Sequence, residues 1–344
     1  VGCAGAYEDR AKKTTRAVAE LLDLAGVSFG VLGNGETCTG DSARRAGNEF
    51  VFQGLAQQNI EVLTEAKAKK VVSTCPHCMN TLKNEYRDLG IELEVIHHTQ
   101  LLNRLVREGK LTPIKGGEGD HKRSITYHDP CYLGRHNQVY TPPRELLQVI
   151  PNAEVKEMPR NSERSFCCGA GGARMWMEEK IGERINLNRT TEAVETGADQ
   201  IAVGCPFCRV MLSDGLTMQQ SKGEAREEVE VLDVAQMLLA SVKGEQATKL
   251  KPGEGAPLQP KAAPAAAAPA APAPAEAKQS VETKAEPEQG DVTITDDTVV
   301  EATETFTAAL STARCFGCFF IILRRNSSGS CPAACATSSM KHSR

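Results

Sequence analysis

The chain has 344 residues, of which 40% are hydrophobic, and this length suffices for two domains that each bury a core. A formal net charge of −4, an aromatic content of 4% and the lack of a basic stripe argue against a nucleic-acid partner. No apolar run approaches the ~20 residues of a membrane span, so we expect membrane association only through parts outside this chain. Thirteen cysteines without a secretory signal indicate metal binding rather than a disulfide framework.

The first half of the chain alternates predicted helices with predicted strands. Apolar residues at helical spacing predict helices, and short apolar runs predict buried strands. In chain order we expect a helix over 10–25, a strand over 27–32, a loop over 33–41 that carries Cys38, a helix over 42–58, a strand over 70–73, a helix after Cys75 and Cys78, a strand over 91–96 and a helix over 99–108. This alternation is typical of an α/β unit.

A segment rich in glycine and charge, residues 113–123, reads as a linker, and the same order then returns. The expected elements are a strand over 124–128 before Cys131, a helix over 143–150, a strand over 154–157 before Cys167 and Cys168, a helix over 173–196, a strand over 200–203 before Cys205 and Cys208, a helix to about 218, a strand over 228–232 and a helix over 234–242. Both CxxC motifs should therefore join a strand end to a helix start, where free backbone N–H groups favour anionic thiolates.

The cysteines reveal an internal duplication. Cys38, Cys75 and Cys78 correspond to Cys168, Cys205 and Cys208 at an offset of 130, and Cys3 corresponds to Cys131 at an offset of 128. A strand is expected before Cys131 but none fits before Cys3, so we expect the chain to begin inside a longer protein. The predicted organisation is a first repeat over 1–112, a linker over 113–123, a second repeat over 124–243, an Ala/Pro-rich and acidic disordered stretch over 244–305 and an unassigned tail over 306–344.

The second repeat offers five thiols with long gaps between them. Iron-sulfur clusters tolerate such gaps because each thiolate can bind a different iron, whereas a structural zinc takes four ligands around one atom. Three other interpretations stay open: buried cysteines without a ligand, a zinc site, and a thioredoxin-like thiol pair. Gly169, Gly171 and Gly172 after the adjacent cysteines would let the backbone approach a cluster closely.

Three segments carry a family resemblance: 128–135 (HDPCYLGR), 166–172 (FCCGAGG) and 205–208 (CPFC). They resemble the cysteine-rich "CCG" domain of the heterodisulfide reductase family, and the likeness extends in two tandem α/β copies over about residues 1–240. The resemblance implies [4Fe-4S] clusters, with a noncubane form in the second copy. Its implied ligands there are Cys131, Cys167, Cys168, Cys205 and Cys208. Thr37 replaces the first cysteine of the pair in the first copy, which leaves Cys3, Cys38, Cys75 and Cys78 for a conventional cluster.

The resemblance also implies a function. Related bacterial iron-sulfur oxidoreductases pass electrons from a flavoprotein donor to a quinone, which would place the full-length protein in the cytoplasm at the inner face of the cell membrane, with a membrane module as partner. Disulfide reduction at the noncubane cluster, as in heterodisulfide reductases, is the alternative, and a zinc-stabilised scaffold without catalysis is a second one. His128 is a candidate for tuning a cluster or handling protons, because imidazole titrates near neutral pH, and a histidine that caps the turn before Pro130 is the competing interpretation.

Overall fold

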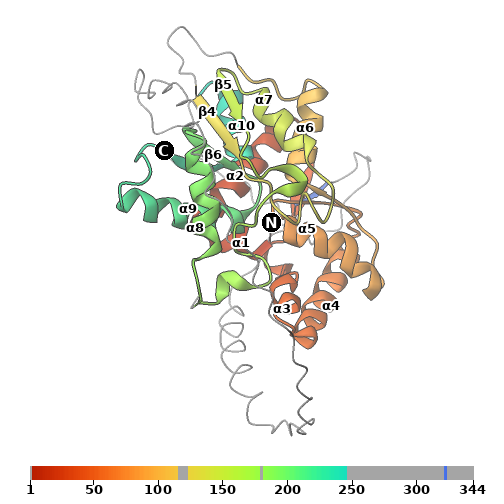
Figure 1. Cartoon of the computed structure of the whole chain (residues 1–344). Helices are drawn as coiled ribbons and strands as arrows, with labels where there is room; N and C mark the ends of the chain where they lie inside the picture. The colour runs from red at the N-terminus through yellow and green to blue at the C-terminus, as the bar shows by residue number, and fades with distance from the viewer. Residues whose placement is uncertain (1, 115–122, 179–180, 246–320, 324–344) are drawn as a thin grey trace, which may run out of the picture. The chain divides into compact units, whose positions relative to one another are not determined.

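The computed structural model describes residues 2–114, 123–178 and 181–245 and the backbone of 321–323 (Figure 1). Every described residue belongs to one compact unit. Most of the predicted linker, of the stretch 244–305 and of the tail 306–344 lies outside the described residues. Within the described residues, no helix combines the length and the apolar character that a membrane span requires.

The first repeat has the predicted alternation of helices and strands. Its elements are α1 (Gly2–Tyr7), α2 (Asp9–Leu24), β1 (Phe29–Val31), α3 (Asp41–Arg45), α4 (Glu49–Glu65), β2 (Lys70–Ser73), α5 (Pro76–Asn80), β3 (Glu94–His97) and α6 (His98–Arg107). The single helix predicted over 42–58 is in fact two helices, α3 and α4. Gly47, at a φ of 85°, ends the first, and the Asn48 side chain accepts a hydrogen bond from the N–H of Val51 to start the second.

The second repeat contains β4 (Arg123–Tyr127), α7 (Thr141–Gln148), β5 (Ala153–Lys156), α8 (Ile185–Glu195), β6 (Gln200–Val203), α9 (Pro206–Ser221), β7 (Glu230–Asp233) and α10 (Val234–Lys243). The helix predicted over 173–196 is wrong in its first half, because α8 begins only at Ile185. Ala173 and Gly182 have positive φ angles, and the side chains of Trp176 and Ile181 are 61% and 88% exposed. Trp176 and Ile181 therefore have no core face to hold them in a helix.

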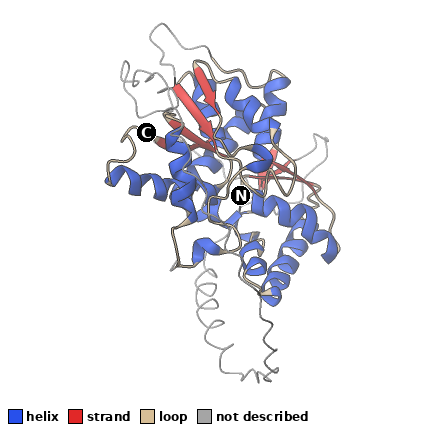
Figure 2. Cartoon of the chain, in the orientation of Figure 1, coloured by secondary structure: helices blue, strands red, loops and turns tan. Residues whose placement is uncertain are grey.

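The strands form two four-stranded sheets (Figure 2). The second repeat has a fully parallel sheet in the order β5-β4-β6-β7. The first repeat has the order β1-β8-β2-β3, in which β2 and β3 are parallel and β8 (Ile321–Leu323) is antiparallel to both of its neighbours. β8 thus takes the place in the first sheet that β4 has in the second.

One apolar core joins the two repeats. Leu21 of α2 and Leu102 of α6 belong to the same buried cluster as Leu147 of α7 and Leu238 of α10. A buried polar contact also crosses the boundary, from His98 Nε2 to Asp233 Oδ1 at 3.1 Å. The cysteines of both CxxC motifs belong together to a second buried cluster.

Candidate metal centre

Each CxxC motif lies where a buried strand passes into a helix. Cys75 follows β2 and is the N-cap of α5, and Cys205 follows β6 and is the N-cap of α9. A proline occupies the first helical position in both, where its missing N–H costs nothing. The backbone N–H groups of Phe207 and Cys208 donate to the Cys205 sulfur. The predicted strand-to-helix placement of both motifs is confirmed.

The five thiols of the second repeat form one series of contacts. Cys131 contacts Cys167, Cys167 contacts Cys168, Cys168 contacts Cys208, and Cys208 contacts Cys205. Cys168, Cys205 and Cys208 are buried, whereas Cys131 and Cys167 are partly exposed, and none of the five is in a disulfide. The structure thus brings together the complete cysteine set predicted for the second repeat.

The four predicted cysteines of the first repeat also converge. Cys3 Sγ and Cys38 Sγ are 4.0 Å apart, and Cys75 contacts Cys78. The hydroxyl of Thr39 donates to Cys78 Sγ at 3.5 Å. In this repeat, four thiols therefore occupy the region that five occupy in the second.

The two thiol sets meet at the repeat boundary. Cys75 of the first set and Cys205 of the second are in direct contact, and both are buried. One series of touching thiols consequently runs from Cys131 through both sets to Cys78.

Burial and the closeness of other thiols shift the pKa values of these cysteines. Contact with Cys167 and burial raise the pKa of Cys131, while contacts with Cys131 and Cys168 lower the pKa of Cys167. Although burial opposes it, hydrogen bonds from Cys208 and Cys75 lower the pKa of Cys205 to about 5. Thiolates packed this closely cannot all ionise without a positive charge among them, and a bound metal ion or cluster supplies that charge. The donor set therefore fits a metal centre made of several sulfur ligands.

Glycines let the backbone close around the partly exposed thiols. The N–H of Gly169 donates to Cys167 Sγ at 3.2 Å, and the N–H of Gly40 donates to Cys38 Sγ at 3.4 Å. Both glycines have positive φ angles, 89° and 82°, which strain any other residue. The backbone thus contacts these predicted ligands, and its approach to a cluster stays a prediction.

His128 lies immediately after β4, beside the second set. One of its ring nitrogens, Cys168 Sγ and Cys208 Sγ all lie within 4.8 Å of one another. Nδ1 accepts a hydrogen bond from Arg189 Nε at 3.0 Å. Burial and the neighbouring Arg189 charge lower the pKa of His128 to about 3. His128 is therefore a neutral group next to the thiols rather than only the cap of a turn.

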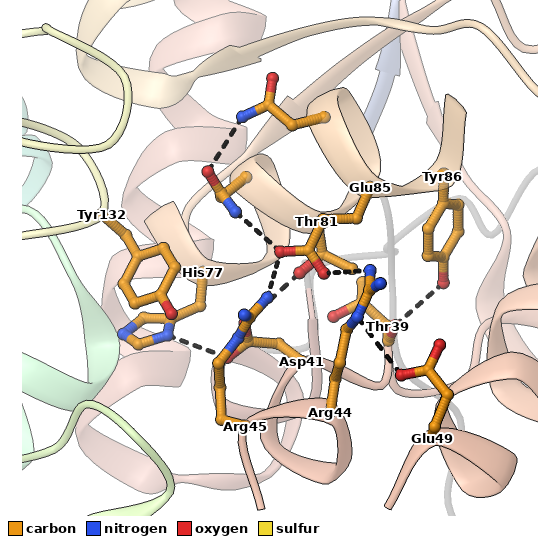
Figure 3. A network of polar contacts seen from close by, with 12 residues as sticks. Thr39, Asp41, Arg44, Arg45, Glu49, His77, Thr81, Glu85, Tyr86 and Tyr132 are labelled. Atoms are coloured by element: carbon orange, nitrogen blue, oxygen red, sulfur yellow. Dashed lines mark hydrogen bonds and ion pairs between the residues drawn. The ribbon is translucent and has the colours of Figure 1, made fainter. Parts of the chain in front are cut away.

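A polar network unforeseen from the sequence includes His77 of the first CxxC motif (Figure 3). His77 Nδ1 is 2.9 Å from Asp41 Oδ2, and the Asp41 carboxylate also pairs with Arg45. The His77 ring packs against the Tyr132 ring of the second repeat with a centroid separation of 4.2 Å. This network fixes the helix that carries Cys78 against the loop that follows Cys131.

Arg189 is the other residue that sequence reasoning missed. It lies in α8 with Asn186, Thr190 and Ala193, which are all buried. An arginine within the buried i, i+3, i+4, i+7 stripe of a helix is the signal that could have identified it. Its side chain is fully buried.

Comparison with known proteins identifies the domain type. The model of the "CCG" cysteine-rich domain matches residues 1–83 and 125–213. These 83 and 89 residues make up half of the chain. The chain belongs to the CCG cysteine-rich domain family. It has two CCG repeats on an α/β fold, as predicted.

Three CCG relatives bear names that indicate chemistry. "Probable iron-sulfur-binding oxidoreductase FadF" of Bacillus subtilis is 47% identical over 254 residues, 74% of this chain and 34% of the relative. "EtfAB:quinone oxidoreductase" of Syntrophomonas wolfei is 45% identical over 244 residues, 69% and 33% of the two chains. One polypeptide of the "Dihydromethanophenazine:CoB--CoM heterodisulfide reductase" of Methanosarcina barkeri is 38% identical over 220 residues, which are 62% of this chain and 52% of the relative. This CCG chain spans about a third of the length of the first two relatives.

Proposed function

We propose that this chain is the iron-sulfur part of an electron-transfer oxidoreductase. The observation that carries the proposal is the convergence of all nine cysteines of the described residues into two adjoining thiol sets. The names of the CCG relatives point the same way. A zinc-stabilised scaffold needs four ligands around one atom and leaves the fifth thiol of the second set without a role.

The residues would divide into two ligand groups. The second site would use Cys131, Cys167, Cys168, Cys205 and Cys208, and the first site would use Cys3, Cys38, Cys75 and Cys78. When bound, a [4Fe-4S] cluster supplies one-electron transfer. The chain excludes water from the buried cysteines and donates backbone N–H groups from Gly40 and Gly169 to sulfur. Both actions influence the potential at which an electron is accepted.

Electrons would arrive from a flavoprotein and leave toward a quinone. The support is the name of the 45% identical relative, an EtfAB:quinone oxidoreductase. Because quinones reside in membranes, the full-length protein would work in the cytoplasm at the inner face of the cell membrane, together with a membrane module. The redox partner would dock where a thiol set approaches the surface, at the partly exposed Cys131 and Cys167.

One observation favours a second function, the reduction of a disulfide. Five thiols, including the adjacent pair Cys167 and Cys168, exceed the four ligands of a conventional cluster. The family resemblance implies a noncubane form for such a set. The heterodisulfide reductase polypeptide of Methanosarcina barkeri is 38% identical to this chain. The first repeat, with Thr37 in place of a cysteine, would hold a conventional cluster.

The test uses the anaerobically purified chain. Electron transfer from a flavoprotein predicts that reduced electron-transfer flavoprotein bleaches the cluster absorbance at a rate that saturates with donor concentration. Failure of this reaction in a protein that dithionite still reduces would contradict the flavoprotein donor. Electron paramagnetic resonance (EPR) of the oxidised protein with and without an added thiol separates the second function, because only direct disulfide chemistry should change the cluster signal.

A further inference from the structure

The direction of the hydrogen bond between Arg189 and His128 determines which ring nitrogen carries a proton. The Arg189 Nε always bears a hydrogen, and it lies 3.0 Å from His128 Nδ1. Nδ1 must accept this bond through its lone pair, so it carries no hydrogen of its own. The single proton of the neutral ring therefore resides on Nε2.

Arg189 is held so that this direction cannot change. Its Nη1 donates to the carbonyl oxygen of Arg160 at 2.9 Å and to Glu192 Oε2 at 2.8 Å. Glu192 is itself fixed by the backbone N–H of Arg160 at 2.7 Å. The Arg189 side chain is fully buried, and its planar guanidinium leaves Nε aimed at the histidine.

His128 Nε2 is the ring nitrogen that Arg189 does not engage. It is buried and has no hydrogen-bond partner among the described residues. A ring nitrogen of His128 lies within 4.8 Å of both Cys168 Sγ and Cys208 Sγ, and Nδ1 is already engaged by Arg189. With Nδ1 engaged, Nε2–H is the ring donor that remains for a sulfur bound on the Cys168–Cys208 side of the site.

We propose that Arg189 is a positioning residue that holds His128 as its Nε2–H tautomer, so that His128 donates a hydrogen bond to sulfur at the Cys168–Cys208 side of the second site. The inference rests on the proposed iron-sulfur function. It distinguishes His128 from an iron ligand, because a ligating Nε2 would need the lone pair that its proton occupies. A hydrogen bond to a cluster sulfur favours the reduced state and raises the reduction potential.

The duplication makes the effect specific to the second site. The helices α4 and α8 occupy equivalent places in the two repeats, because their last residues, Glu65 and Glu195, are 130 positions apart. At the same offset, position 59 in α4 is equivalent to Arg189 in α8. Position 59 is an asparagine, which donates to the backbone oxygen of Cys38 at 2.9 Å. The side-chain donor to sulfur in the first repeat is instead the Thr39 hydroxyl.

Two substitutions and one spectroscopic measurement test the proposal. Arg189→Lys keeps the positive charge but loses the fixed Nε–H, and His128→Phe keeps a ring without a donor. Both variants should retain iron and labile sulfide, and both should shift the midpoint potential of the second cluster to a more negative value. The potential of the first cluster is the internal reference and should stay unchanged.

The nitrogen coupling in the wild-type protein tests the same point without a substitution. With ¹⁵N-labelled histidine, pulsed EPR should show a weak coupling at the second cluster, typical of a hydrogen-bonded imidazole. A strong coupling of a ligating nitrogen, loss of iron in His128→Phe, or an unchanged potential in the variants would overturn the proposal. Absence of iron and sulfide from the wild-type protein would instead contradict the proposed function.

Discussion

Cys75 and Cys205, the first cysteines of the two CxxC motifs, are in contact although 130 positions separate them in the chain. Both follow the carboxyl end of a strand and start a helix, so the duplication places equivalent residues on either side of the repeat boundary. The two ligand sets are separate in sequence but adjoin in space. A substitution should therefore act on one site or on both according to its distance from this contact.

Cys168→Ser should deplete the second site and leave the first site occupied. Among the described cysteines, Cys168 contacts Cys167 and Cys208 of its own set, so its loss removes one ligand from one site. Iron analysis combined with EPR should show a partial loss of iron with the spectrum of the first cluster retained. Cys38→Ser is the matched variant of the other repeat and should give the converse result. Complete loss of iron in either variant would mean that the chain has one site rather than two.

Cys205→Ser should disturb both sites. Cys205 contacts Cys208 in its own set and Cys75 in the other. We expect this variant to lose the second cluster and, unlike Cys168→Ser, to change the EPR spectrum of the first. Identical first-cluster spectra in the two variants would show that the contact between Cys75 and Cys205 has no effect on the first site.

Removal of metal should expose the thiols in two groups. Cys3, Cys38, Cys131 and Cys167 are partly exposed, whereas the other five cysteines of the described residues are buried. After chelation under native conditions, iodoacetamide should modify the partly exposed group first, as followed by mass spectrometry of peptides. Protein unfolded in urea is the control and should show similar rates at all nine positions. Early modification of Cys205 in the folded protein would contradict the burial described here.

Arg144→Ala should lower the free energy of unfolding substantially. Arg144 pairs with Asp129 through two bonds of 2.7 and 2.8 Å, and the Asp129 side chain is only 2% exposed. Removing one partner of a buried ion pair leaves the other charge uncompensated and costs about 3 kcal/mol or more. The exposed pair of Arg104 and Glu108 provides the control, since Arg104→Ala should change stability by less than about 1 kcal/mol. Equal midpoints of urea unfolding for the two variants would contradict the predicted difference in stability.

Two helical glycines should respond in opposite directions to substitution by alanine. A Cβ at Gly215 in α9 would lie 3.1 Å from Thr190 Cβ and 3.2 Å from Asn186 O, so Gly215→Ala should destabilise the packing of α8 on α9 by about 1–3 kcal/mol. Gly54 in α4 is exposed and has no atom within 4 Å of that position. Gly54→Ala should therefore stabilise the protein by up to about 1 kcal/mol. Urea unfolding of both variants measures the two signs, and a stabilised Gly215→Ala would contradict the close packing.

Hydrophobic periodicity and cysteine spacing predicted the strands and helix starts well where these depend on a few consecutive residues. The strands at 70–73 and 200–203 have the predicted bounds, and a helix starts at the proline inside each CxxC motif. The helix predicted over 173–196 is confirmed only from Ile185. Its first half is wrong because Trp176 and Ile181 matched a helical pattern without a core to pack against. The sequence pattern shows which residues are apolar, but whether they can pack against a core depends on the tertiary fold.

The candidate site was predictable as a set of cysteines but not as an arrangement. The duplication paired Cys75 with Cys205 by offset, yet no spacing rule states that the two thiols touch. The contact of Arg189 with His128 joins positions 61 residues apart, and neither residue type indicates it alone. Contacts between repeats depend on how the shared core orients the two sheets, and that information is distributed over the whole chain.

The most direct test of the account is the content of iron, acid-labile sulfide and zinc in the anaerobically purified chain. Two adjoining thiol sets predict about eight irons and about eight sulfides per chain if each binds a [4Fe-4S] cluster, with little zinc, and about half of this iron in Cys168→Ser. Stoichiometric zinc without labile sulfide would contradict the iron-sulfur function and leave a zinc-bound scaffold in its place.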